Sequence, residues 1–367
     1  MQLKDQPGAG GQLNPQSEIR NPKLENPQSE IRNPQSRNSQ SEIRNPKLEN
    51  SQSEIRNPQL LHFFACFTAF STFLLIFAGG LVTSNDAGLA VPDWPLSFGK
   101  WMPEMVGGVF YEHGHRMIAG FVGMLTIILA VWISLKEPRR WVRGLGWIAL
   151  AVIVTQGLLG GITVLYFLPP AVSMAHAALA QGFFCLAVTL AVVTGSKWWS
   201  EASESETSDI PSLRGLSASL IGVIYLQLVF GAGYRHNALG VVPHIVGAAV
   251  VLFLTAWLAF RTVRNYPKSW ARHVSLLLAL VLGQTVLGVA TFFIKHASQS
   301  APQPTPEFVW SATSHVALGA LILATALVFA LRTQRHIVSR ESEPQASTRS
   351  ERSEPRLLPE IIREFEQ

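Results

Sequence analysis

The sequence contains few charged residues and only two cysteines. Asp, Glu, Lys and Arg make up 14% of its 367 residues, against roughly 25% in an ordinary soluble domain. Cys66 and Cys185 both lie inside apolar segments, and the chain has no Cys-x-x-Cys pair. The composition therefore argues against a soluble domain, and the cysteines indicate neither a disulfide framework nor a thiolate metal site.

Between the charged segments lie apolar runs that are long enough to cross a bilayer as helices, which takes about 20 residues. Eight such spans are predicted, at residues 61–82, 110–134, 145–167, 171–195, 214–234, 240–260, 273–294 and 309–331. The predicted fold class is therefore all-α: a polytopic membrane protein with eight transmembrane helices.

The basic residues of the short loops predict which way the spans run. Cytoplasmic loops carry an excess of Lys and Arg, and the loops after the second, fourth, sixth and eighth spans are the basic ones. The opposite side offers Lys100, Arg235 and Lys295. We therefore predict a multi-pass protein of the cell (plasma) membrane with both termini in the cytoplasm. This topology explains the net charge of +5, so no nucleic-acid partner is expected.

The first residues form a tail with a period of twelve, as in NPQSEIRNPKLE. Each repeat has little more than one Ile and an occasional Leu to bury, and proline interrupts it, so we expect disorder. The predicted domains are a disordered repeat tail at 1–58, an N-terminal four-helix half at 59–197, a cytoplasmic linker at 198–213, a C-terminal four-helix half at 214–335 and a disordered charged tail at 336–367.

Four histidines open alternate spans: His115, His176, His244 and His315. Because the even-numbered spans run from outside to inside, all four are predicted near the outer leaflet at similar depth. One histidine at a helix end is usually only an interfacial polar group, whereas four at matched depth indicate a shared role. Neutral imidazole is a good ligand for haem iron, and helix bundles commonly hold cofactors between facing helices. Zinc fits less well, because no HExxH motif is present.

The two halves of the chain resemble each other. TQGLLGGIT in the third span corresponds to GQTVLGVAT in the seventh, and each is followed by a loop and a histidine-bearing span. We predict two duplicated four-helix bundles, with His115 facing His176 in the first and His244 facing His315 in the second. Small residues near the histidines leave room for a flat macrocycle, although such residues also serve ordinary helix packing in membranes.

One carboxylate distinguishes the two halves. In FYEHGHRMIAG, Glu112 lies three residues before His115 and shares its helix face, whereas Val241 takes the corresponding place before His244. An acidic group near hydrocarbon is costly, which makes Glu112 a functional candidate that could take a proton or stabilise a developing cation. The alternative is an interfacial ion pair between Glu112 and Arg116 that only orients the helix.

Over about residues 60–335 the chain resembles the haem A synthase family. The resemblance rests on EHGHR, which matches the family's Glu-x-x-His-Arg pattern, and on GGLVTSNDAGLAVPDWP, which is similar to the family's loop after the first span. The histidines of the other even spans and the repeated halves also match. One departure is that the loop from Thr83 to Val109 lacks the cysteine pair of some bacterial members.

The resemblance implies a function and a set of roles. The family oxidises the C8 methyl of haem O to a formyl group by successive hydroxylations, giving haem A for terminal cytochrome oxidase. It implies that His244 and His315 ligate a resident haem b, that His115 and His176 flank the substrate haem O, and that Glu112 is catalytic with Arg116 in support. The implied partners are a haem O synthase as donor, the assembly of cytochrome oxidase and an electron acceptor that the sequence does not identify; a homo-oligomer is compatible with it.

Three other points stay open at this stage. Trp94 and Trp101 are typical of interface anchors, or could lie over a haem edge. A di-haem b-type electron-transfer protein would also explain four histidines, but not why only one half has Glu112. A transporter with repeated halves is less favoured, because transporters place broken helices at mid-membrane and the polar groups here lie at the outer ends.

Overall fold

The computed structural model describes residues 58–196, 198, 204–205 and 212–338. Apart from their innermost residues, the two tails predicted to be disordered lie outside this part of the chain, as does most of the predicted linker. Those predictions therefore stay untested outside this part of the chain, whereas a helix begins at Pro58 in the predicted N-terminal tail, and a helix end and a two-residue strand occupy residues 336–338 of the predicted C-terminal tail.

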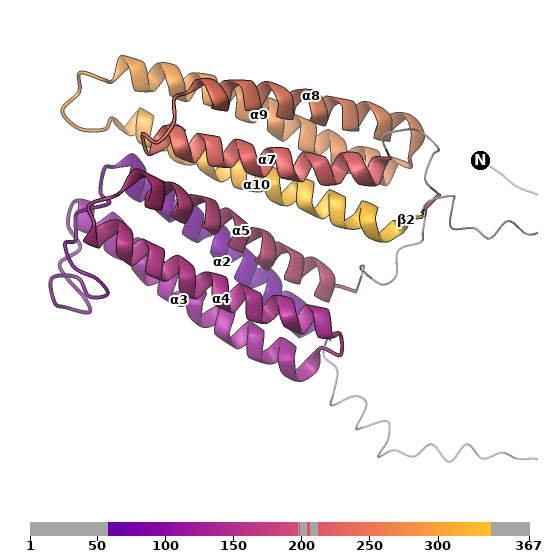
Figure 1. Cartoon of the computed structure of the whole chain (residues 1–367), viewed down its shortest axis with the longest axis horizontal. Coiled ribbons are helices and arrows are strands. Elements are labelled where there is room, and N and C mark those ends of the chain that lie inside the picture. The colour runs from indigo at the N-terminus through magenta and orange to yellow at the C-terminus, as the bar shows by residue number, and fades with distance from the viewer. Residues whose placement is uncertain (1–57, 197, 199–203, 206–211, 339–367) are drawn as a thin grey trace, which may run out of the picture. The chain divides into compact units, whose positions relative to one another are not determined.

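Eight long helices make up nearly all of the described structure, as Figure 1 shows. They are α2 (Pro58–Ser84), α3 (Gly108–Lys136), α4 (Arg140–Leu165), α5 (Pro170–Thr194), α7 (Leu213–Arg235), α8 (Val242–Asn265), α9 (Lys268–Ala297) and α10 (Pro306–His336). All eight are long and apolar enough to cross a membrane. The predicted all-α fold with eight spans is confirmed, and the protein is a multi-pass membrane protein.

The only β-strands in the described residues form a short parallel pair, β1 (Glu204–Ser205) with β2 (Ile337–Val338). Such a short pair has no periodicity that a sequence could show, and it was not predicted. Because lipid offers no hydrogen bonds, the rest of the apolar chain must satisfy its backbone within helices.

Local signals mark where several helices begin. Ser212 and Thr305 precede α7 and α10, and their side-chain oxygens accept hydrogen bonds from the Gly215 and Phe308 amides. Proline stands in the first turn of α5, α8 and α10, where its missing N–H costs no hydrogen bond. The sequence itself therefore marks where the helices that carry the second, third and fourth histidines begin.

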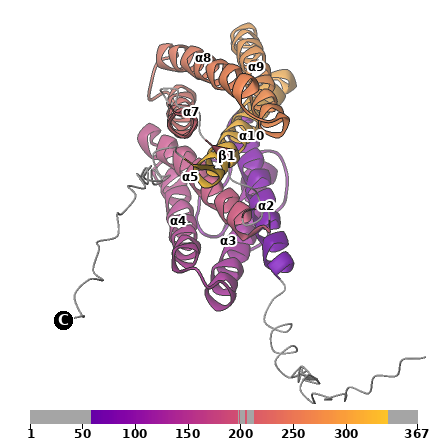
Figure 2. The same cartoon turned by 90° about the vertical axis from the view of Figure 1, so that its right-hand side faces the viewer.

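The helices pack as two groups of four. In each group, α2–α5 and α7–α10, successive helices pack on one another and the last packs on the first; Figures 1 and 2 show the groups in indigo to magenta and in red to yellow. Each group has its own apolar core, which includes Leu129 and Phe183 in the first and Leu258 and Phe329 in the second. Their origin by duplication stays a prediction.

Helix α10 joins the groups, because it packs on α2 and α5 as well as on α7 and α9. Polar bonds between the end of α2 and residues of α7 and α10 reinforce this contact. Ser84 of α2 shares a 3.0 Å hydrogen bond with Thr313 of α10 and accepts one of 2.6 Å from Arg235 of α7. Hydrogen bonds of this kind between helices help to hold membrane bundles together.

Candidate functional site

Each of the four predicted histidines packs against a glycine of the preceding helix. A Cβ atom added to that glycine would lie closer to the histidine ring than ordinary van der Waals contact allows. Its distance from the histidine Cε1 would be 3.1 Å for Gly79 and His115, 3.2 Å for Gly160 and His176, 2.9 Å for Gly231 and His244, and 2.7 Å for Gly288 and His315. The four histidines therefore occupy equivalent places in four consecutive helix pairs.

The histidines of the second group face each other. The ring centroids of His244 and His315 lie 6.1 Å apart, and their planes make an angle of 76°. A bond from imidazole nitrogen to a first-row metal is about 2 Å long. Two such bonds, added to the distance from each ring centroid to its nitrogen, come close to that separation. The pair fits the ligation of one haem iron from both sides.

In the first group, His115 and His176 lie close enough to interact electrostatically. No three His, Cys, Asp or Glu side chains of the described residues come together as a set that could hold a metal ion. A zinc site built from protein ligands alone needs about four of them, whereas a porphyrin leaves only two positions for the protein. The paired histidines therefore suit haem better than zinc.

Three glutamines that sequence reasoning missed bind three of the histidines. The side-chain Nε2 atoms of Gln156, Gln227 and Gln284 donate to the backbone carbonyls of His176, His244 and His315, at 2.9, 2.8 and 2.9 Å. Each glutamine lies four residues before the glycine that the ring contacts. The recurring Gln-x-x-x-Gly pattern in α4, α7 and α9 was the signal that could have revealed them.

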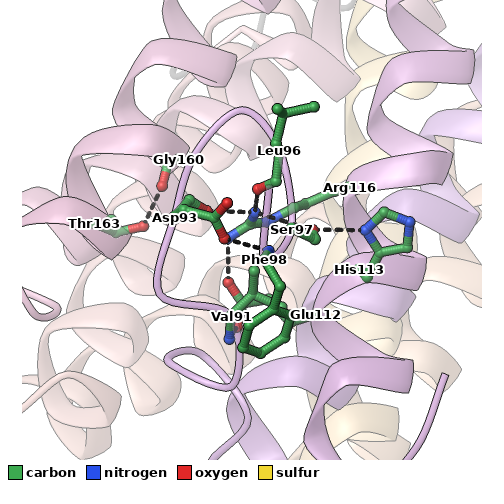
Figure 3. A network of polar contacts seen from close by, with 10 residues as sticks. All are labelled: Val91, Asp93, Leu96, Ser97, Phe98, Glu112, His113, Arg116, Gly160 and Thr163. Carbon is green, nitrogen blue, oxygen red and sulfur yellow. Dashed lines mark hydrogen bonds and ion pairs between the residues drawn. The ribbon is translucent and has the colours of Figure 1, made fainter. Parts of the chain in front are cut away.

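Glu112 is buried, with 4% of its surface exposed, and both of its carboxylate oxygens are bonded. Oε2 accepts from the Val91 amide at 2.8 Å, and Oε1 accepts from Arg116 Nη2 at 2.5 Å. Figure 3 shows Glu112 and Arg116 of α3 beside Val91 of the loop 85–107. The ion pair considered as an alternative role is therefore present within α3, and the bond from the Val91 amide connects Glu112 to the loop.

Arg116 extends this network into the loop. Its Nη1 donates to the carbonyls of Asp93 and Leu96 at 2.7 and 2.9 Å, as Figure 3 shows. The Asp93 carboxylate accepts from the amides of Phe98 and Gly99. The Gly99 amide first, then the Phe98 amide and the Arg116 charge, lower the pKa of Asp93. The turn is therefore closed by a carboxylate that stays ionised.

The same loop reaches the neighbouring helices. A Cβ atom at Gly161 of α4 would lie 2.7 Å from the Trp94 ring, and the next glycine toward the N-terminus, Gly160, receives His176. Trp94 thus packs beside the first histidine pair. Trp101 is 84% exposed, as an interface anchor would be.

The residues at the C-terminal end of α7, Arg235 and His236, interact with helices of the first group. Arg235 donates to Ser84 Oγ and to the Gly80 carbonyl of α2. Burial first, then the charges of Arg235 and His176, lower the pKa of His236 to about 4. His236 is therefore neutral at physiological pH, and it lies within electrostatic range of the first histidine pair.

Known proteins are similar in sequence to the part of the chain that holds the first histidine pair. The cytochrome oxidase assembly protein family matches residues 105–243, a segment that holds Glu112, His115, Arg116 and His176. The chain is similar to proteins named haem A synthase from three bacteria. The predicted family resemblance is confirmed.

The similarity to these haem A synthases is moderate in identity and differs in extent. The protein of Symbiobacterium thermophilum is 29% identical over 168 residues, which are 44% of this chain and 55% of that protein. That of Alkalihalophilus pseudofirmus is 27% identical over 272 residues, 65% of this chain and 89% of that protein. That of Shouchella clausii is 28% identical over 265 residues, 63% and 86%. The chain thus spans about half the length of the first relative and most of the other two.

Proposed function

We propose that this chain is a haem A synthase, an enzyme that oxidises the C8 methyl of haem O to a formyl group by successive hydroxylations. One observation carries the proposal. Of four equivalent histidine positions, His115 alone has a carboxylate, Glu112, three residues before it in the same helix. A reaction confined to one of two haem sites requires such an asymmetry, whereas electron transfer between two haems does not.

The two histidine pairs divide the work in this proposal. His244 and His315 would hold a resident haem b, and His115 and His176 would flank the substrate. When bound, the resident haem would supply one-electron redox chemistry. The 6.1 Å between the His244 and His315 rings supports the first assignment, and the proximity of Glu112 to His115 supports the second.

Glu112 would act as a fixed negative charge beside the substrate. The Val91 amide and Arg116 both donate to its oxygens, so charge-assisted bonds hold the carboxylate in place. A preorganised carboxylate can stabilise positive charge that develops at the reacting group, and it can accept the proton released there. Arg116 would support it, because it holds both Glu112 and the loop.

The loop 85–107 would limit the access of water from the outer side. It is bonded to α3 through Glu112 and Arg116, and Trp94 packs on α4 beside the residue that receives His176. Excluding water strengthens electrostatic interactions in a site. Because the polar contacts come from the loop backbone, they do not depend on the loop cysteines that this chain lacks.

The remaining assignments follow from the same proposal. The protein would lie in the plasma membrane with both termini in the cytoplasm, take haem O from a haem O synthase and provide haem A for the assembly of cytochrome oxidase. The names of the relatives favour this enzyme over the di-haem electron-transfer protein.

The test is conversion in a host that makes no haem A. The full chain is expressed together with a haem O synthase, and the haems are extracted and identified by mass and by reduced pyridine spectrum. Haem A, or a hydroxylated precursor, is expected only when this chain is present. Haem b alone, from a folded protein in membranes that contain haem O, would contradict the proposal.

A further inference from the structure

Three of the four histidine-bearing helices are tied to the preceding helix by a glutamine. Besides its bond to the histidine carbonyl, each glutamine Nε2 lies beside the imidazole of the same residue: 3.1 Å from Nδ1 of His176, 3.0 Å from Nδ1 of His244 and 3.3 Å from Nε2 of His315. The amide therefore contacts both the backbone and the ring. A shift of the ring would disturb both contacts.

The remaining helix pair, α2 and α3, which carries His115, has no such glutamine. In α2, the residue four positions before Gly79 is Leu75, an apolar side chain that is 8% exposed. The backbone carbonyl of Leu75 is near His115, but Nδ1 of that ring has no hydrogen bond of ordinary geometry and no side-chain partner. His115 is therefore held by packing and the nearby Leu75 carbonyl, whereas His176, His244 and His315 are held by packing and a glutamine side-chain amide.

The two haem sites of the proposed function have opposite requirements. A resident cofactor must stay bound through many turnovers, whereas a substrate must enter and its product must leave in each one. A ligand that is held by fewer bonds is more easily displaced, since each net hydrogen bond adds to the stability of the held position. The missing amide falls in the pair assigned to the substrate.

We infer that His115 is the releasable ligand of the substrate site, and that Gln156, Gln227 and Gln284 are positioning residues that keep the other three histidines in place. This inference rests on the proposed function. The substrate haem would thus be retained on the His176 side, while His115 moves aside on entry and exit. Leu75 permits this movement because its side chain, unlike that of a glutamine, forms no hydrogen bond to the ring or to the His115 carbonyl.

The experiment measures how fast haem leaves the purified full-length protein. The protein is loaded with ferric haem b, which stands in for the substrate in the first site, and an excess of apomyoglobin captures the haem that is released. Two phases are expected in the Soret absorbance, and His244→Ala should remove the slower one. Leu75→Gln, which supplies the missing amide, should slow the faster phase about fivefold, the effect of one net hydrogen bond.

The reverse substitutions test the same inference without adding a buried polar group. Gln156→Leu should speed the faster phase and Gln227→Leu the slower one, each about fivefold. The matched control is Gln181→Leu, because Gln181 of α5 is also buried but has no hydrogen bond to a histidine among the described residues. It should leave both phases unchanged.

A single phase in the wild-type protein would overturn the inference, as would rates that neither glutamine-to-leucine substitution alters. If Leu75→Gln does not fold, the two reverse variants decide. Failure of the proposed function shows separately: the expected release phases without any haem A in the conversion assay would leave the ligand assignment intact and reject the enzyme.

Discussion

The helix pair α2–α3 and the three other histidine-bearing pairs share a scaffold but differ at two positions. All four place a histidine ring against a glycine. Where the other pairs have a glutamine, α2 has Leu75; where the others have Ser173, Val241 and Ala312, α3 has Glu112. Both differences are found in the helix pair that carries His115. This pair has no glutamine side chain bonded to its histidine, and it alone has a carboxylate three residues before the histidine.

The loop that precedes His115 also differs from the loop that precedes His244. The loop 85–107 is long and is bonded to α3 through Glu112 and Arg116, whereas the loop 236–241 between α7 and α8 is short. A covered site with a carboxylate and a loosely held ligand suits chemistry on an exchanging molecule. A site with two tied histidines suits a permanent cofactor.

The largest expected effect is at the second pair. His244→Ala removes one of the two proposed ligands, so we expect the affinity for the resident haem to fall by more than the roughly 10- to 100-fold that losing a ligand's hydrogen-bonding partner costs. The haem content per protein measures this. His296→Ala, at an exposed histidine in the last turn of α9, should keep the full content. An unchanged content and spectrum for His244→Ala would refute the assignment.

A smaller effect is expected at the glycines. In Gly288→Ala the new Cβ would lie 2.7 Å from the His315 ring, and such overpacking costs about 1–3 kcal/mol, so resident-haem occupancy should fall. In Gly160→Ala the new Cβ would lie 3.2 Å from His176, so the haem occupancy of the site at His115 and His176 should fall less. Gly283→Ala in α9 faces open space and is the control; equal haem occupancy in all three variants would contradict the idea that these glycines make room for the histidine rings.

Much of this organisation could be predicted from the sequence. Apolar length revealed the eight helices, and the positions of the histidines in alternate spans revealed the pairs. The helix ends were less well predicted, since hydropathy falls where charges begin although the helix continues. The last span was predicted at 309–331, yet α10 runs from Pro306 to His336.

The contacts between helices could not be predicted in the same way. The bonds from Gln227 to His244 and from Arg235 to Ser84 depend on how each helix is rotated toward its neighbour, which the spacing within one helix does not show. The pairing of Glu112 with Arg116 follows from a separation of four residues. The second partner of Glu112, the Val91 amide, is a backbone group whose position depends on the path of the loop.

The central claim is that the helix pair with Glu112 carries out the reaction, and the haem A to haem O ratio of Glu112→Gln tests it most directly. The control is Glu137→Gln at the other end of α3, where the carboxylate is also buried and bonded to an arginine. With equal haem b content in both variants, we expect Glu112→Gln to lower conversion at least about 100-fold and Glu137→Gln to retain it. A normal ratio in Glu112→Gln would contradict the account.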